Sequence, residues 1–142
     1  MTGKNEIEEG AIELLSFKVG EQVYSVDIKS IREIRSWTRA TPLPKSPNYI
    51  NGVINLRGTV LPVLDLAKRL QVPGSNISER SVIIVSQIDD RTVGLIVDAV
   101  SDILAVQSAD LQQPPEIAVD GPDKFVSFLT IVDETMIRVL DL

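Results

Sequence analysis

The sequence predicts a mainly β fold made of two similar small units, each a compact barrel or sandwich. Hydrophobic residues make up 44% of the chain but aromatic residues only 4%, so Val, Ile and Leu must fill the core, and these residues favour strands. Short apolar runs separated by turn signals recur about every 8–12 residues. The segment VYSVDIKSIREI (23–34) also aligns without a gap with TVGLIVDAVSDI (92–103), half a chain later.

Composition excludes several classes of function. The net charge is −6, which disfavours binding to nucleic acid or to an anionic bilayer. The chain has no cysteine and no histidine, so zinc sites, thiol nucleophiles and Ser-His-Asp triads are absent. We therefore expect no catalytic residues, no metal and no cofactor.

Targeting signals are also missing from the sequence. The first residues are acidic where a signal peptide would be basic, and no stretch reaches about 20 apolar residues. We expect a cytoplasmic protein that does not insert into the membrane, with a flexible leader over residues 1–14.

The first unit is expected to span about 15–80 and to begin with a strand at 15–19. Gly20-Glu21 can form a turn into a second strand at 23–26. Asp27 is a plausible N-cap for a short amphipathic helix, because Ile28, Ile31 and Ile34 then repeat every three residues.

Three prolines within 41–47 predict an irregular loop, and a β-hairpin follows it. Gly58 can adopt the positive φ that a two-residue turn needs, so Arg57-Gly58 reads as the hairpin tip and Arg57 as an exposed cation. Pro62 in the second strand predicts a sheet edge or a bulge. One helical turn is expected at 67–70.

The second unit is expected to span about 81–142, with a possible strand exchange at the chain termini. It contains a strand at 82–85, a turn at Asp89-Asp90, a returning strand at 93–97, and an Asp98 that we interpret as a helix cap. A second proline loop follows, and 136–140 reads as a closing strand of either unit. Two such units leave a groove between them.

Several motifs together resemble the CheW family of bacterial chemotaxis coupling proteins. They are EIR at 33–35, the stretch from 48 to 58 that ends in NLRG, VLPVLDL at 60–66 and VGLIVDAVSDIL at 93–104. The similarity extends from residue 15 to 142. It implies two SH3-like five-stranded β-barrel subdomains with short connecting helices, and a non-enzymatic adaptor that joins the cytoplasmic tips of chemoreceptors to the regulatory domain of the histidine kinase CheA.

The resemblance also implies two sets of contact residues. Receptor contacts map onto Ile31, Gly52, Asn55, Arg57 and Gly58. Kinase contacts map onto the charged pair of the EIR motif, Glu33 and Arg35. The resemblance implies that residues of the second barrel also contact the kinase.

Glu33 and Arg35 could instead be ordinary solvated charges. A purely structural role also stays open for four of the receptor-contact positions. Arg57 could be a solvated turn residue, and Ile31 a core residue like Ile28 and Ile34. Gly52 and Gly58 have simple backbone explanations as turns or close approaches.

Other functions remain as alternatives. The same module occurs within the kinase itself and in coupling proteins fused to a receiver domain. A small barrel could bind single-stranded nucleic acid, but that would require a basic groove with stacking aromatics. An enzyme would need a catalytic cluster, and none is recognisable in the motifs.

Overall fold

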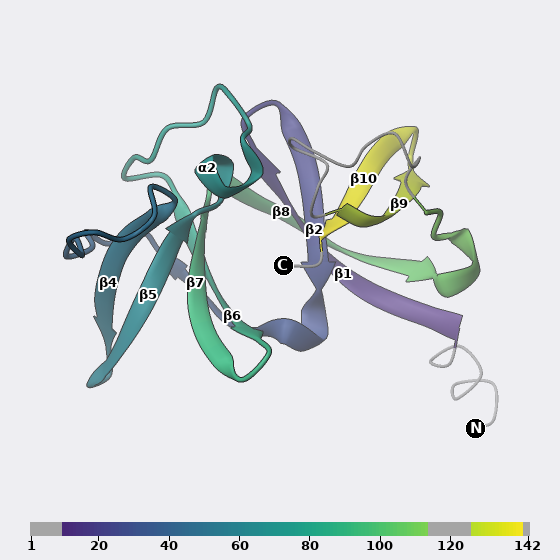
Figure 1. Ribbon diagram of the computed structural model, residues 1–142. Helices are drawn as coiled ribbons and strands as arrows, with labels where there is room; N and C mark the ends of the chain where they lie inside the picture. Colours follow the sequence, from purple (N-terminus) through teal and green to yellow (C-terminus); the bar gives the residue numbers. More distant parts are fainter. Residues whose placement is uncertain (1–9, 114–125, 141–142) are drawn as a thin grey trace.

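The computed structural model describes residues 10–113 and 126–140, and these residues confirm a mainly β fold. Ten strands form two five-stranded sheets, which we name sheet A and sheet B (Figure 1). Sheet A contains β1 (Ala11–Val19), β2 (Gln22–Asp27), β8 (Ala99–Gln107), β9 (Val126–Val132) and β10 (Thr135–Leu140). Sheet B contains β3 (Ile31–Ser36), β4 (Ile50–Leu56), β5 (Thr59–Asp65), β6 (Val82–Ile88) and β7 (Arg91–Val97).

The internal repeat corresponds to a structural repeat. Sheet A has the order β8-β1-β2-β10-β9 and sheet B the order β3-β6-β7-β5-β4, so the two sheets match strand for strand. Each contains one parallel pair, β2 with β10 and β5 with β7. The first repeated segment covers β2 and the start of β3, and the second covers β7 and the start of β8. Both segments therefore describe a chain that crosses from one sheet to the other.

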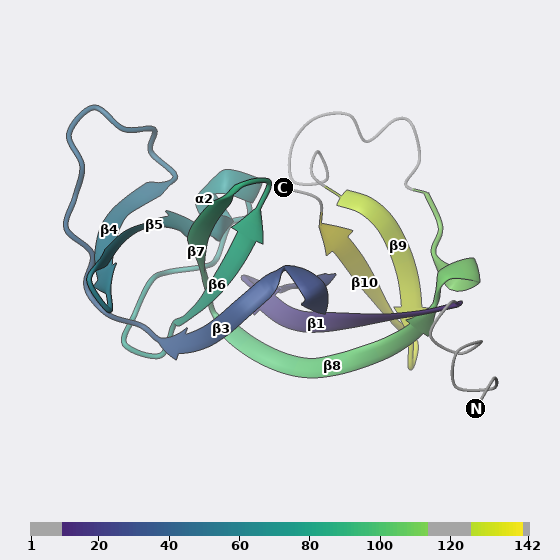
Figure 2. The ribbon, with the colours of Figure 1, turned by 90° about the horizontal axis from the view of Figure 1, so that it is seen from below.

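These crossings make the predicted boundary near residue 80 wrong. After the β1–β2 hairpin the chain leaves sheet A, and β3 pairs with β6 of sheet B. After the β6–β7 hairpin it returns, and β8 pairs with β1. In Figure 2, β3 and β8 follow one another along the lower edge of the molecule. Sheet B is thus a continuous central segment, while sheet A joins the two ends of the described chain and includes β10, the predicted closing strand.

Neither ladder closes into a complete barrel within the described residues. The chain beyond β3 makes a single bridge from Thr41 to Val53 on the outer edge of β4. The chain beyond β8 makes the matching bridge from Gln112 to Leu129 on β9. Each sheet is therefore strongly curled, and its two edges are joined by one bridge in place of a continuous ladder.

The helix expected at 28–34 does not form. Asp27 does cap a helical turn, since its carboxylate accepts a hydrogen bond from the Lys29 backbone N–H, but this 3₁₀ turn, η1, covers only Ile28–Ser30. β3 begins at Ile31, and its residues alternate between half-buried and exposed. Isoleucine is β-branched and favours strands, so a three-residue spacing of isoleucines was not sufficient to indicate a helix.

Other local predictions are confirmed or refined. β1 begins at Ala11, so part of the expected leader is strand, and residues 1–9 lie outside the described residues. The predicted helical turn is α2 (Leu66–Leu70). Pro62 lies in β5, which is an inner strand and not an edge, but pairing with β7 begins only at Val63. The second proline loop lies outside the described residues.

The two sheets share one main hydrophobic core. Most of its buried residues come from β1 and β2 of sheet A, from β6 and β7 of sheet B, and from α2, which lies between the sheets in Figure 1; β9, β10 and the segment after α2 add one residue each. Phe17, Val19, Tyr24, Leu66, Leu70 and Ile84 are completely buried in it. Burial of an aliphatic side chain contributes about 1.5–3 kcal/mol, so this shared core holds both sheets in one structural unit.

Candidate functional site

The β4–β5 hairpin tip has the predicted two-residue turn. Arg57 and Gly58 both have positive φ, 52° and 88°, as a type I′ turn requires. The Asn55 side-chain oxygen accepts a hydrogen bond of 2.8 Å from the Gly58 backbone N–H and so braces the turn. The Arg57 side chain is 70% exposed. The sequence thus places a guanidinium on a rigid, solvent-facing support.

Arg57 is paired with a carboxylate from another strand. Its guanidinium donates to Glu33 Oε1 at 2.5 Å, and the Arg35 guanidinium donates to Glu33 Oε2 at 3.3 Å. Glu33 and Arg35 lie on β3, at the opposite edge of sheet B from β4, so the curl of the sheet brings them to the hairpin tip. Residues expected to contact two different partners therefore form one charge cluster, which we call the Arg57 cluster: Glu33, Arg35 and Arg57.

The pairing shifts the titration of both partners. The hydrogen bond from Arg57 is the largest cause that holds the pKa of Glu33 below its ordinary value; desolvation opposes it, and the hydrogen bond from Arg35 adds a smaller lowering. The Glu33 carboxylate in turn raises the pKa of Arg57. The cluster therefore carries a net positive charge at neutral pH, and Arg57 remains accessible to a second acceptor.

Gly52 is buried, and its neighbours explain why the position is glycine. A Cβ placed on it would lie 2.3 Å from the Thr41 backbone oxygen. The segment beyond β3 crosses β4 at this point to make the Thr41–Val53 bridge. A Cβ on Gly58, by contrast, would meet no atom within 4 Å, so that glycine serves the turn.

Of the three isoleucines, Ile34 departs from its predicted place in the core. Ile31 is half-buried and packs against the main core, as its structural interpretation required. Ile34 was assigned to the core, but it is 47% exposed because it lies on the outward side of β3. Ile28 is partly buried beside a shallow surface hollow. Reading 31–36 as a strand would have predicted the exposure of Ile34 from its alternation.

Asp98 is not a helix cap. Its carboxylate accepts hydrogen bonds from the Gly20 backbone N–H at 2.8 Å and from the Ser75 hydroxyl at 2.5 Å. Asp89-Asp90, as predicted, forms the β6–β7 turn.

Residues 10–113 and 126–140 contain no cluster of three or more metal-ligating side chains. Among the same residues, no helix is long and apolar enough to cross a membrane.

The fold and the cluster define a class of two-sheet β protein with a charged, solvent-facing hairpin tip. A model of the CheW-like domain matches residues 13–142. The chain therefore belongs to the CheW-like domain family.

Named relatives and a solved structure agree with this membership. The chain is 47% identical over 133 residues to the chemotaxis protein CheW of Rhizobium meliloti, with 94% of this chain and 86% of that one covered. It is 34% identical to CheW of Klebsiella aerogenes, covering 92% and 78% of the two chains. The crystal structure of the scaffolding protein TtCheW from Thermoanaerobacter tengcongensis superposes with a TM-score of 0.85 at 32% identity, covering 92% and 89%.

Proposed function

We propose that this protein is a non-enzymatic scaffold that couples chemoreceptors, the methyl-accepting chemotaxis proteins, to the histidine kinase CheA. Membership of a scaffold family supports the general role. The proposal places the protein in the cytoplasm, at arrays of membrane-bound receptors. Its partners are proteins only, and it needs no cofactor.

The Arg57 cluster is the single observation that supports the position of the proposed binding surface. An arginine on a braced turn loses little conformational freedom on binding, and its planar guanidinium can bind a carboxylate or a backbone carbonyl with two hydrogen bonds. Receptor binding would use Arg57 directly, with the exposed Asn55 and Gly58 beside it. Gly52 and Ile31 would support this surface from within the fold.

Kinase binding would use the β3 side of the same cluster, through Glu33 and Arg35. Their side chains are 29% and 34% exposed, so each offers part of its surface to a partner while held by an intramolecular bond. Partners that meet at neighbouring surfaces of one scaffold are held near each other without needing a large or tight interface.

Co-sedimentation tests the role directly. The protein is mixed with receptor-containing membranes and the kinase, and kinase activity is measured in the pellet. We expect the protein to bring the kinase into the pellet and to raise its activity. Absence of both effects would refute coupling.

Two substitutions distinguish the proposed kinase surface from the proposed receptor surface. Glu33→Lys should remove kinase binding while receptor binding is retained, and Arg57→Glu should do the reverse. If both interactions survive Glu33→Lys, then Glu33 has no part in the kinase surface.

A further inference from the structure

Asp98 occupies the point at which the chain crosses from sheet B to sheet A. It lies between the end of β7 and the start of β8, and its backbone N–H donates to the Lys18 carbonyl of β1 at 2.9 Å. Its carboxylate receives the two hydrogen bonds from Gly20 and Ser75. One half-buried side chain thus joins the β1–β2 turn of sheet A to the segment that follows α2.

The same three segments are packed closely at this end of the molecule. A Cβ on Gly20 would lie 2.5 Å from the Pro73 backbone oxygen and 3.0 Å from a Val72 methyl. Val72 itself is buried in the main core. In Figure 1 the segment after α2 runs along the top of the molecule beside the β1–β2 turn. The junction of the sheets is therefore closed here, and we call this contact the Asp98 clasp: Gly20, Ser75 and Asp98.

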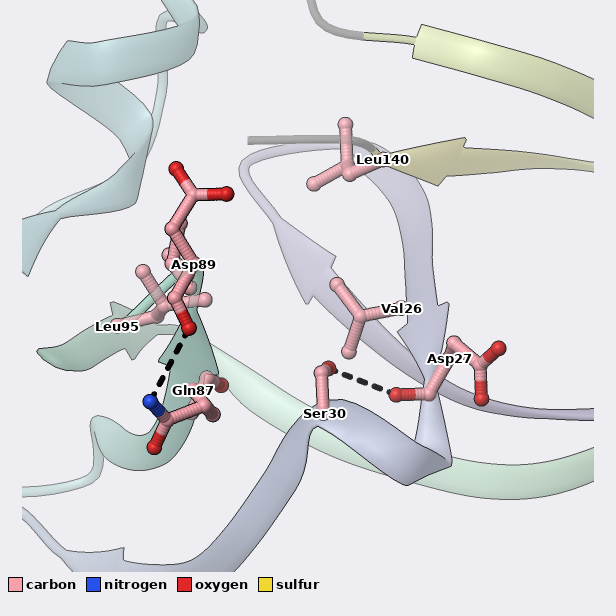
Figure 3. A pocket seen from close by; sticks show the side chains of 9 residues that line it. Val26, Asp27, Ser30, Gln87, Asp89, Leu95 and Leu140 are labelled. Carbon is pink, nitrogen blue, oxygen red and sulfur yellow. Dashed lines mark hydrogen bonds between the residues drawn. The ribbon is translucent and has the colours of Figure 1, made fainter. Parts of the chain in front are cut away.

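The other end of the junction is open. A cavity of about 220 Å³ lies between the sheets where the chain makes its first crossing, through η1. Figure 3 shows Val26 and Leu140 on the sheet A side facing Leu95 and Asp89 on the sheet B side. The hydrogen bonds drawn there, Ser30 to the Asp27 carbonyl and Gln87 to the Asp89 carbonyl, are local and join no residue of one sheet to a residue of the other.

We infer that Asp98 is a positioning residue: its carboxylate fixes the angle between the two sheets and thereby the width of the cavity at the opposite end of their junction. The strand that connects the two ends is β2, which runs from Gln22, next to the Gly20 turn of the clasp, to Asp27, which lines the cavity. Its six residues span roughly 20 Å, so a rotation of about 10° at the clasp moves the sheet A wall of the cavity by about 3 Å. This inference concerns the protein without partners and is independent of the proposed function.

The absence of cysteine makes the test direct, because spin labels attach only where cysteine is introduced. One labelled pair, Lys29→Cys with Asp90→Cys, spans the cavity between η1 and the β6–β7 turn. A reference pair, Thr59→Cys with Thr92→Cys, lies within sheet B. Distances are measured by double electron–electron resonance in full-length protein carrying Asp98, Asp98→Ala, Asp98→Asn or Ser75→Ala.

We expect Asp98→Ala to shift or broaden the cavity distance by about 3 Å while the reference distance stays unchanged. Asp98→Asn should preserve the native distance, because the amide oxygen can accept from Gly20 and the amide N–H can donate to Ser75. Ser75→Ala should give a smaller shift. An unchanged cavity distance in Asp98→Ala, an equal change in both pairs, or an Asn variant that behaves like Ala would overturn the inference. If Asp98→Ala does not fold, an unchanged cavity distance in Ser75→Ala overturns it.

Discussion

The hairpin tips of the two sheets have the same backbone but opposite charge. In the β4–β5 tip Arg57 and Gly58 have φ of 52° and 88°, and in the β9–β10 tip Asp133 and Glu134 have φ of 50° and 67°. A threonine opens the following strand in both hairpins, at positions 59 and 135. The two tips are therefore equivalent turns, 76 residues apart in the chain.

Among the residues that the structure describes, only the hairpin tip of sheet B makes an ion pair. Glu33 corresponds in the repeat to Asp102, so sheet A has an acidic residue at this position and acidic residues at its tip, where sheet B has Arg57. Sheet A nevertheless curls and makes the matching Gln112–Leu129 bridge. The fold does not require the ion pair, which favours a binding role for the Arg57 cluster over a purely structural one.

The largest expected effect distinguishes Gly52 of β4 from its counterpart in sheet A. Phe128 stands in β9 where Gly52 stands in β4, and both lie at register shifts of their hairpins. Gly52→Ala should lower the free energy of unfolding by about 3 kcal/mol, because the new Cβ meets the Thr41 carbonyl and the backbone is strained. Denaturant unfolding measures the change.

Gly58→Ala is the matched control for this substitution. Its Cβ meets open space, so only the cost of positive φ remains, about 1 kcal/mol. Equal losses in the two variants would contradict the steric explanation for Gly52.

The next largest effect is a difference in stability between Asp substitutions at Ile31 and at Ile34, two residues of β3. Ile31 and its repeat counterpart Val100 both pack against the main core, whereas Ile34 is exposed. Ile31→Asp should lower the free energy of unfolding by about 2 kcal/mol or more, since it places a carboxylate without a partner at a half-buried position against the main core. Ile34→Asp should change stability by less than about 0.5 kcal/mol. Thermal and denaturant unfolding test both, and a stable Ile31→Asp protein that loses receptor binding would reassign Ile31 to the interface.

Arg57→Glu tests the charge difference between the tips. The proposed receptor surface predicts that binding weakens at least about tenfold, or about 1.4 kcal/mol, and the 70% exposure of the Arg57 side chain predicts little change in melting temperature. Asp133→Arg in the equivalent turn is the control and should leave receptor binding intact. Full receptor binding by Arg57→Glu, measured by co-sedimentation, would remove Arg57 from the surface.

The sequence indicated most of the strands because their signals are local. The β4–β5 turn follows from Gly58, and the β6–β7 turn from Asp89-Asp90. The exchange of β3 and β8 between sheets could not be predicted, because strand partners are chosen by tertiary packing and a gapless repeat does not say which sheet each segment joins. The helix predicted at 28–34 is wrong for a similar reason, because the spacing of three isoleucines fits both a helix and a strand.

The candidate site could be predicted residue by residue but not as a cluster. Arg57 and Glu33 are 24 residues apart, and they meet only because sheet B curls until its opposite edges approach. Likewise, nothing in the local sequence of Asp98 indicates Gly20 or Ser75 as its partners. Contacts of this kind depend on topology, which the motif spacing does not encode.

The smallest expected effect concerns the pH dependence that sheet B gains from its ion pair. Because the pKa of Glu33 is lowered in the folded protein, its stabilising contribution is fully present above the unfolded value of about 4.3 and is lost as pH falls through the folded value. Melting temperatures of the native protein and of Glu33→Gln should therefore differ most near neutral pH and converge in acid. The same comparison in an Arg57→Gln background should show a smaller difference, because the hydrogen bond from Arg57 is the largest cause of the shift. A difference in melting temperature that is constant with pH, or that grows in acid, would mean that the ion pair does not stabilise the folded state.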